Sequence, residues 1–142
     1  MPDFTDAQYY LNRECTWIKF NERVLREAIV PSNPLLEQLN FIAIASSNLD
    51  EFFMIRVAGV KHLVESGVRH IDIAGMTPAE QFDAIQSMVH ELVADQYRYY
   101  DGIQQKLQDH GIHFIGVDEL NEDQHMWLDE FFGREIYPVV TP

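Results

Sequence analysis

The architecture of this chain follows from residues 77–111, which read TPAEQFDAIQSMVHELVADQYRYYDGIQQKLQDHG. Thr77 and Glu80 have the spacing of a capping box, and Pro78 stands at the first helical position, so a helix is predicted to start here. Gly111 is the residue expected just past a helix C-terminus. In between, apolar residues alternate spacings of three and four, as in a coiled-coil seam that Gln96 interrupts. The seam residues are Phe82, Ile85, Val89, Leu92, Tyr99 and Ile103.

Two further helices are predicted upstream of this one. Thr16 can cap a first helix that runs to about Ile29. Asn33, as the N-cap ahead of Pro34, predicts the start of a second helix. Ser46-Ser47-Asn48 then forms either a bend or a polar patch on one long helix, because short polar side chains compete for backbone hydrogen bonds. We favour a continuous helix that ends near Ser66.

The predicted fold class is mainly α, an antiparallel bundle of long helices over residues 1–110, because three helices joined by short loops pack in this way. After Gly111 the pattern changes. Residues 112–117, IHFIGV, predict a short strand, and Asn121 predicts the N-cap of a helix that ends near Tyr137. One strand cannot form a sheet on its own, so residues 111–142 are interpreted as the beginning of a second, incomplete domain.

Composition excludes several classes of protein. The chain has 142 residues, of which 46% are hydrophobic and 23% charged, so it is not a disordered or fibrous chain. The only cysteine is Cys15, the start from Met1 does not resemble a secretory signal, and no apolar run is long enough for a membrane span. These features predict a cytoplasmic protein without a transmembrane segment.

The net charge of -13 argues against nucleic acid as a partner. The charge is unevenly distributed. Residues 1–70 carry seven basic and nine acidic groups, whereas residues 71–142 carry three basic and fourteen acidic groups. A surface that meets an anionic ligand is therefore expected in the first half.

Most chemical motifs are absent. The two glycine-rich patterns that bind phosphate groups, G-x-x-x-x-G-K and G-x-G-x-x-G, do not occur in the sequence. His110 and His113 are close enough to suggest joint metal binding, but two surface histidines at a helix end are the better interpretation. Cys15 has no feature of a nucleophile beside it and is interpreted as structural.

Residues 46–53, SSNLDEFF, are harder to dismiss, because they place an amide, hydroxyls and carboxylates beside two aromatic rings. Arg56 follows Asn48 by eight residues, about two helical turns. The Asn48 amide offers both a donor and an acceptor, which suits the edge of a purine base. The alternative is a polar helix surface on which Arg56 pairs with an acidic residue one turn away.

Three blocks of sequence closely resemble the start of the long, type-1 polyphosphate kinases. They are Trp17-x-x-Phe20-Asn21-Glu22-Arg23-Val24-Leu25-x-Glu27-Ala28, Ser32-Asn33-Pro34-Leu35-x-Glu37 and Ser47-Asn48-Leu49-Asp50-Glu51-Phe52-Phe53-x-x-Arg56-Val57. Residues 134–142, REIYPVVTP, resemble the passage with which that family enters its head domain. Thr16 stands where the family usually has serine, and the change retains a capping hydroxyl.

The resemblance implies an enzyme that reversibly transfers the terminal phosphate of ATP to polyphosphate, through a phosphohistidine and with magnesium. In that family the catalytic histidines, the metal ligand and the polyphosphate contacts lie in other domains, so no residue here is assigned a catalytic or metal-binding role. The family's nucleotide-contacting asparagine corresponds to Asn48, which is therefore expected to bind ATP or ADP. The full enzyme is expected to be a homo-oligomer in which this module docks on the remaining domains. The resemblance is also compatible with peripheral association of the full enzyme with a membrane.

Two hypotheses remain. In the first, the chain is the nucleotide-facing module, since a neutral adenine edge needs no cationic site and a module at -13 cannot line a polyphosphate tunnel. In the second, it is a structural helical bundle in which Asn48 touches no ligand. The position of the Asn48 side chain, in a concave surface or turned into the bundle, separates them. Asp50 and Glu51 are expected to hold Arg56 or backbone donors in place, and the chain alone is expected to be inactive.

Overall fold

A computed structural model describes residues 6–140 of the chain. It is mainly helical, and within these residues no strand is present. The α-helices are α1 (Arg13–Arg26), α2 (Leu35–Phe52), α3 (Ala58–Glu65), α4 (Pro78–Asp109) and α5 (Glu122–Phe131). Short 3-10 turns form η1 (Ala7–Tyr9), η2 (Glu27–Ile29), η4 (Val117–Glu119) and η6 (Tyr137–Val139), and π-helical turns form η3 (Phe53–Val57) and η5 (Phe132–Ile136).

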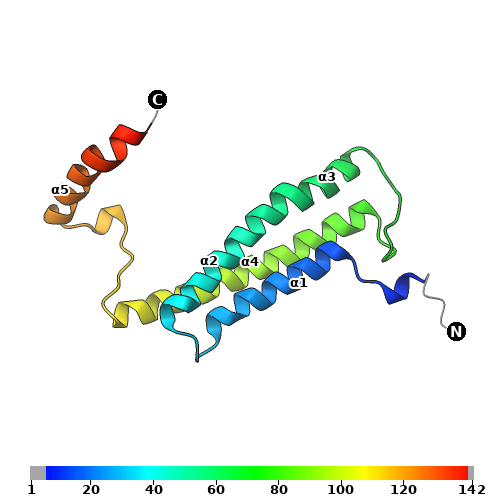
Figure 1. The fold of residues 1–142 in the computed structure, drawn as a ribbon, viewed down its shortest axis with the longest axis horizontal. Coiled ribbons are helices and arrows are strands. Elements are labelled where there is room, and N and C mark those ends of the chain that lie inside the picture. Colours follow the sequence, from blue (N-terminus) through cyan, green and yellow to red (C-terminus); the bar gives the residue numbers. More distant parts are fainter. Residues whose placement is uncertain (1–5, 141–142) are drawn as a thin grey trace.

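The first four α-helices form the predicted antiparallel bundle. α1 and α4 run in one direction, and α2 with α3 returns in the other (Figure 1). The predicted capping box of α4 is confirmed, with the Thr77 backbone N–H donating to Glu80 Oε2 at 2.8 Å and the Glu80 backbone N–H donating to Thr77 Oγ1 at 3.3 Å. Gly111 follows α4 with a φ of 77°, a left-handed conformation that favours glycine.

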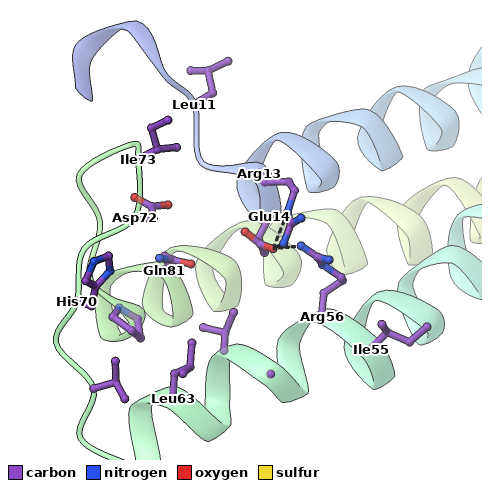
Figure 2. A pocket seen from close by; sticks show the side chains of 14 residues that line it. Leu11, Arg13, Glu14, Ile55, Arg56, Leu63, His70, Asp72, Ile73 and Gln81 are labelled. Atoms are coloured by element: carbon purple, nitrogen blue, oxygen red, sulfur yellow. Dashed lines mark hydrogen bonds and ion pairs between the residues drawn. The ribbon is translucent and has the colours of Figure 1, made fainter. Parts of the chain in front are cut away.

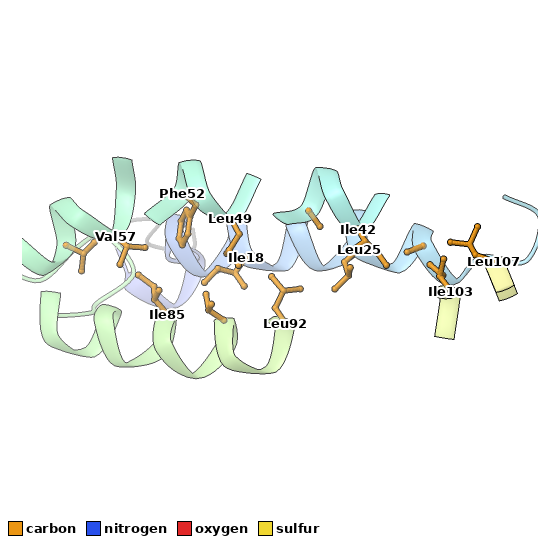
Figure 3. Close-up of a cluster of buried hydrophobic side chains, with 14 residues drawn as sticks. Ile18, Leu25, Ile42, Leu49, Phe52, Val57, Ile85, Leu92, Ile103 and Leu107 are labelled. Atoms are coloured by element: carbon orange, nitrogen blue, oxygen red, sulfur yellow. The ribbon is translucent and has the colours of Figure 1, made fainter. Parts of the chain in front are cut away.

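The hydrophobic core lies along the whole length of the bundle (Figure 3). Each of the four helices contributes to it, and the predicted seam of α4 faces inward. Ile85, Ile103 and Leu107 of α4 are at most 1% exposed. Burial of this kind stabilises a protein by about 25 cal/mol per Å² of apolar surface, so the core is the main source of stability in the bundle.

Two predicted helix starts are wrong. The cap of α1 is Asn12, whose Oδ1 accepts a hydrogen bond from the Cys15 backbone N–H at 2.9 Å, whereas Thr16 lies inside the first turn. The cap of α2 is Pro34, which provides no side-chain hydrogen bond. Asn33 instead donates through Nδ2 to the Glu27 carbonyl at 2.8 Å. The first helix therefore begins earlier than predicted, and the second begins one residue later.

The predicted continuous second helix is confirmed, with one irregularity. Ser46-Ser47-Asn48 is regular α-helix, and the distortion lies later, in η3, where the Ala58 backbone N–H donates to the Phe53 carbonyl five residues earlier. A π-helical turn of this kind adds one residue to a helix without losing its hydrogen bonds. It leaves Phe52 and Val57 both buried although five residues separate them.

The predicted strand over residues 112–117 is wrong. Residues 112–116 have no regular secondary structure and Val117 begins η4, and among the described residues no strand is present that could pair with this segment. The predicted helix start at Asn121 is confirmed, since its Oδ1 accepts from the Gln124 backbone N–H at 2.9 Å. Residues 1–5 and 141–142 lie outside the described residues, and they include the start that was compared with a secretory signal and the end of the passage that resembles a head-domain entry.

Figure 1 shows α5 set apart from the bundle, at the end of the segment that follows α4. The boundary at residues 110 and 111 stays a prediction. A search of the described residues found no helix that is both long and apolar enough to cross a membrane.

Candidate functional site

Asn48 lines a cavity between α1 and the helix formed by α2 and η3. The cavity has a volume of about 370 Å³. Its walls combine aromatic, amide and charged side chains, and all of them come from these elements. The lining residues are Arg13, Glu14, Trp17, Phe20, Asn48, Glu51, Phe52, Ile55 and Arg56. The first and third of the quoted sequence blocks therefore meet at this cavity.

The side chain of Asn48 is half-buried and belongs to a chain of two hydrogen bonds, the relay, that runs from Asn48 through Asn21 to the Ala45 carbonyl. Asn21, which is fully buried on α1, donates through Nδ2 to the Ala45 carbonyl at 2.9 Å. Asn48 donates through Nδ2 to Asn21 Oδ1 at 3.1 Å. Within residues 6–140 no protein group donates to Asn48 Oδ1. Asn48 therefore does both of the things that were posed as alternatives, because it contacts the bundle and also lines a concave surface.

Aromatic rings form the apolar wall of this cavity. Trp17 stacks on Phe52 with ring centroids 4.2 Å apart and an interplanar angle of 2°. Phe20 lies one turn further along α1, is 48% exposed and has the Arg23 guanidinium 5.9 Å from its ring centroid. An exposed aromatic ring beside a fixed one provides a flat apolar surface suited to a planar ligand.

An ion-pair cluster lies between this cavity and a larger one of about 710 Å³. The buried carboxylate of Glu14 accepts from Arg56 Nη2 at 2.5 Å and from Arg13 Nε at 3.3 Å (Figure 2). The cluster joins α1 to η3 across the bundle. Because Glu14 is only 8% exposed, removal of Arg56 would leave a poorly compensated buried charge.

One alternative and one expectation about charged residues are therefore wrong. Arg56 pairs with Glu14 on another helix, and not with an acidic residue one turn away. Asp50 and Glu51 are both exposed, and among the described residues neither side chain makes a hydrogen bond or ion pair. The π-helical turn explains the Arg56 geometry. The last buried positions of α2 are Leu49 and Phe52. In a regular α-helix the next buried position would be residue 56, but the extra residue of η3 makes Val57 the buried one and leaves Arg56 free to reach Glu14.

Sequence reasoning missed Asn21, although it lies in the first quoted block, and it missed Glu14, which lies three positions before that block. One signal was available for Asn21, a polar residue on the apolar face of an amphipathic helix, which needs a partner when it is buried. The signal for η3 was the five-residue gap between Phe52 and Val57. No comparable signal pairs Glu14 with Arg56, because 42 residues separate them.

The remaining candidates have no support as reactive sites. Burial raises the pKa of the Cys15 thiol above its usual value, and the charges of Glu14 and Asp72 raise it further, so the thiolate is disfavoured. His110 and His113 are both exposed. A search of residues 6–140 found no group of three metal-ligating side chains of the His, Cys, Asp or Glu type.

Comparison with known proteins gives consistent matches. Residues 10–115 match the family described as the polyphosphate kinase N-terminal domain. A polyphosphate kinase of Halalkalibacterium halodurans is 49% identical and matches 99% of this chain. One of Thermosynechococcus vestitus is 45% identical over 99% of the chain, and one of Prochlorococcus marinus is 42% identical over 96%. The chain spans about one fifth of the length of these relatives, 19% or 20% in each case.

Proposed function

Because the chain belongs to the polyphosphate kinase N-terminal domain family, we propose that it is the module of such an enzyme that binds the adenine base of ATP or ADP. The enzyme as a whole would transfer the terminal phosphate of ATP to polyphosphate through a phosphohistidine in another domain. Magnesium and polyphosphate would also be bound by other domains, and this module would dock on them within a homo-oligomer.

The observation that carries the proposal is the position of the Asn48 amide, in a cavity that also has an aromatic wall. Adenine presents a flat apolar face and an edge with both an amino donor and ring-nitrogen acceptors. Trp17 and Phe20 offer apolar surface for the face, and Asn48 offers for the edge an oxygen that no group of residues 6–140 pairs with. Asparagine amides pair with this edge of adenine in other proteins.

The charges of the cavity also favour a base over a phosphate chain. Arg13 and Arg56 are balanced by Glu14, which accepts from both, and by the exposed Glu51. A cavity without net charge attracts a polyanion weakly, since phosphate binding depends on an excess of cationic groups. A neutral base has no such requirement.

The proposal is tested by kinetics of the full-length enzyme with Asn48→Ala. Loss of a hydrogen bond in a partly desolvated site should weaken ATP binding by about 1–3 kcal/mol. The contact to the base is the same in the ground state and the transition state, so the loss should raise KM and leave kcat nearly unchanged. Asn40→Ala is a matched control, because Asn40 is an exposed asparagine on the same helix whose side chain donates to Glu37 and does not line the cavity.

A second proposal concerns the 142-residue chain alone, which we expect to be inactive. Phosphoryl transfer needs a bound metal and cationic stabilisation of the transferred group, and we assign both of these to other domains of the enzyme. Incubation of the purified chain with radiolabelled ATP should release or transfer no phosphate above a blank preparation. Clear transfer would contradict this assignment of the chemistry to other domains.

One observation favours the structural alternative, in which Asn48 serves only the bundle. Its bond to Asn21 joins α2 to α1 and could be its whole role. The same Asn48→Ala enzyme separates the two functions. A raised KM with little change in melting temperature supports base binding, whereas an unchanged KM with a lowered melting temperature supports the structural role.

A further inference from the structure

The relay from Ala45 to Asn48 determines which atom of the Asn48 amide is free. The Ala45 carbonyl can only accept a hydrogen bond, so the Asn21 amide must turn its Nδ2 toward it. Asn21 Oδ1 then faces Asn48, and it can only accept. Asn48 must therefore donate through Nδ2, and its Oδ1 has no protein partner among residues 6–140. The backbone of α2 thus fixes the orientation of an amide that would otherwise be free to rotate.

We infer that Asn21 is a positioning residue that makes the nucleotide site selective for a 6-aminopurine over a 6-oxopurine. The inference rests on the proposed function. With Asn48 Oδ1 offered to the ligand, the site accepts a hydrogen bond from the 6-amino group of adenine. Hypoxanthine and guanine carry an acceptor oxygen at that position, which would face another acceptor.

The burial of Asn21 makes this orientation costly to reverse. Turning the Asn48 amide over would place its Oδ1 against Asn21 Oδ1, and turning Asn21 as well would place its oxygen against the Ala45 carbonyl. Asn21 is 0% exposed, so water cannot compensate for either pair of acceptors. A free asparagine could match both classes of purine by rotating, whereas this one is held in the orientation that suits adenine.

The test compares ATP with ITP in the full-length enzyme, because the two nucleotides have the same ribose and triphosphate and differ only in the purine. Contacts that other domains make to the phosphates cancel in the ratio of kcat/KM. We expect the wild type to prefer ATP by about tenfold to a hundredfold, the usual discrimination of an amide contact to a base edge. Equal use of ATP and ITP by the wild type would overturn the inference.

Asn21→Ala tests the positioning role itself. In this variant the Asn48 amide can rotate, so the ratio of kcat/KM for ATP to kcat/KM for ITP should fall toward one. Asn40→Ala should retain the wild-type ratio. A purely structural role for Asn21 would lower activity with both nucleotides by the same factor, and that result would contradict the inference. If Asn21→Ala fails to fold, Asn48→Ala still tests whether the Asn48 amide determines the ATP preference, since it removes the selective group. Retention of the preference in Asn48→Ala would also overturn the inference.

The two proposals fail in different ways. If Asn48→Ala leaves the KM for ATP unchanged, the proposed function is wrong. If Asn48→Ala raises that KM but Asn21→Ala keeps the ATP preference, the base site stands and only the positioning role of Asn21 is wrong.

Discussion

The bundle of α1 to α4 and the segment that follows α4 have equally well-formed helices but very different interiors. In the bundle, residues such as Ile85, Leu25 and Ala28 are at most 1% exposed. From residue 108 to residue 140, by contrast, every residue is exposed or half-exposed, including Trp127 at 63%. Helix caps occur in both regions, so local signals alone do not distinguish them.

The difference shows which properties of a helix are local. Asn121 and Gln124 cap α5 with the same reciprocal bonds that Thr77 and Glu80 make in α4. A cap selects where a helix begins, but most of the stability of a helix comes from packing its apolar face. In α5 the apolar surface includes the stacked rings of Trp127 and Phe131, which contact each other and no buried core.

Hydrogen exchange should show the largest difference between the two regions. Amides in the middle of α4 should exchange only through global unfolding, whereas amides of α5 should open locally. We expect protection in α4 to exceed that in α5 by about a hundredfold or more. Equal protection of the two helices in the 142-residue chain would mean that the boundary near Gly111 is misplaced.

Truncation of one apolar side chain in each region should give the next largest difference. Ile85→Ala removes a side chain that is 0% exposed and should lower the free energy of unfolding by about 2–5 kcal/mol. Leu128→Ala, at 37% exposed, should change it by less than about 0.5 kcal/mol. Urea denaturation followed by circular dichroism measures both. A comparable loss in the two variants would show that α5 belongs to the cooperative core.

Removal of the helix caps should give a smaller contrast. Thr77→Ala should lower the free energy of unfolding of the bundle by about 1 kcal/mol, because the Glu80 backbone N–H loses its side-chain acceptor. Asn121→Ala removes an equivalent cap from α5 and should leave the midpoint of global unfolding unchanged. The urea midpoints of the two variants provide the measurement, and a shift of the same size in both would contradict the comparison.

The smallest expected effect is the pH dependence of the α4 cap. Hydrogen bonds from the Thr77 backbone N–H and hydroxyl hold the pKa of Glu80 below its ordinary value of 4.5. Because the folded-state pKa is lowered, this contribution is present above pH 4.5 and is lost as the pH falls through the folded-state pKa. The stability difference between wild type and Glu80→Gln should therefore shrink on acidification. A difference that stays constant from pH 7 to pH 3 would rule out this linkage.

Periodicity and capping chemistry predicted the bundle, because α4 combines a reciprocal cap at Thr77 with a regular seam that includes Ile85 and Ile103. The start of α1 was mispredicted because Asn12 and Thr16 are both good caps, and only the tertiary contact of Asn12 Nδ2 with Asp72 Oδ2, at 2.8 Å, favours the first. The strand over residues 112–117 was mispredicted because β-branched composition says nothing about whether a partner strand exists.

The candidate site was predicted in part. Asn48 was identified from its chemistry and from the family resemblance, and the structure places it in a cavity with Trp17 and Phe20. Its partner Asn21 and the pairing of Arg56 with Glu14 depend on how α1 lies against α2. Such contacts between residues that are distant in the sequence follow from packing, which a single sequence does not reveal.

The most direct test of the base site is a titration of the 15N-labelled chain with adenosine, followed by NMR through the side-chain amide signals. The account predicts that the Asn48 amide and the Trp17 indole shift together and saturate with one dissociation constant. The exposed Asn40 amide, on the same helix, should stay unchanged. Saturating shifts at Asn40 and not at Asn48, or no shift at Asn48 up to the solubility limit of adenosine, would contradict the claim that this cavity binds adenine.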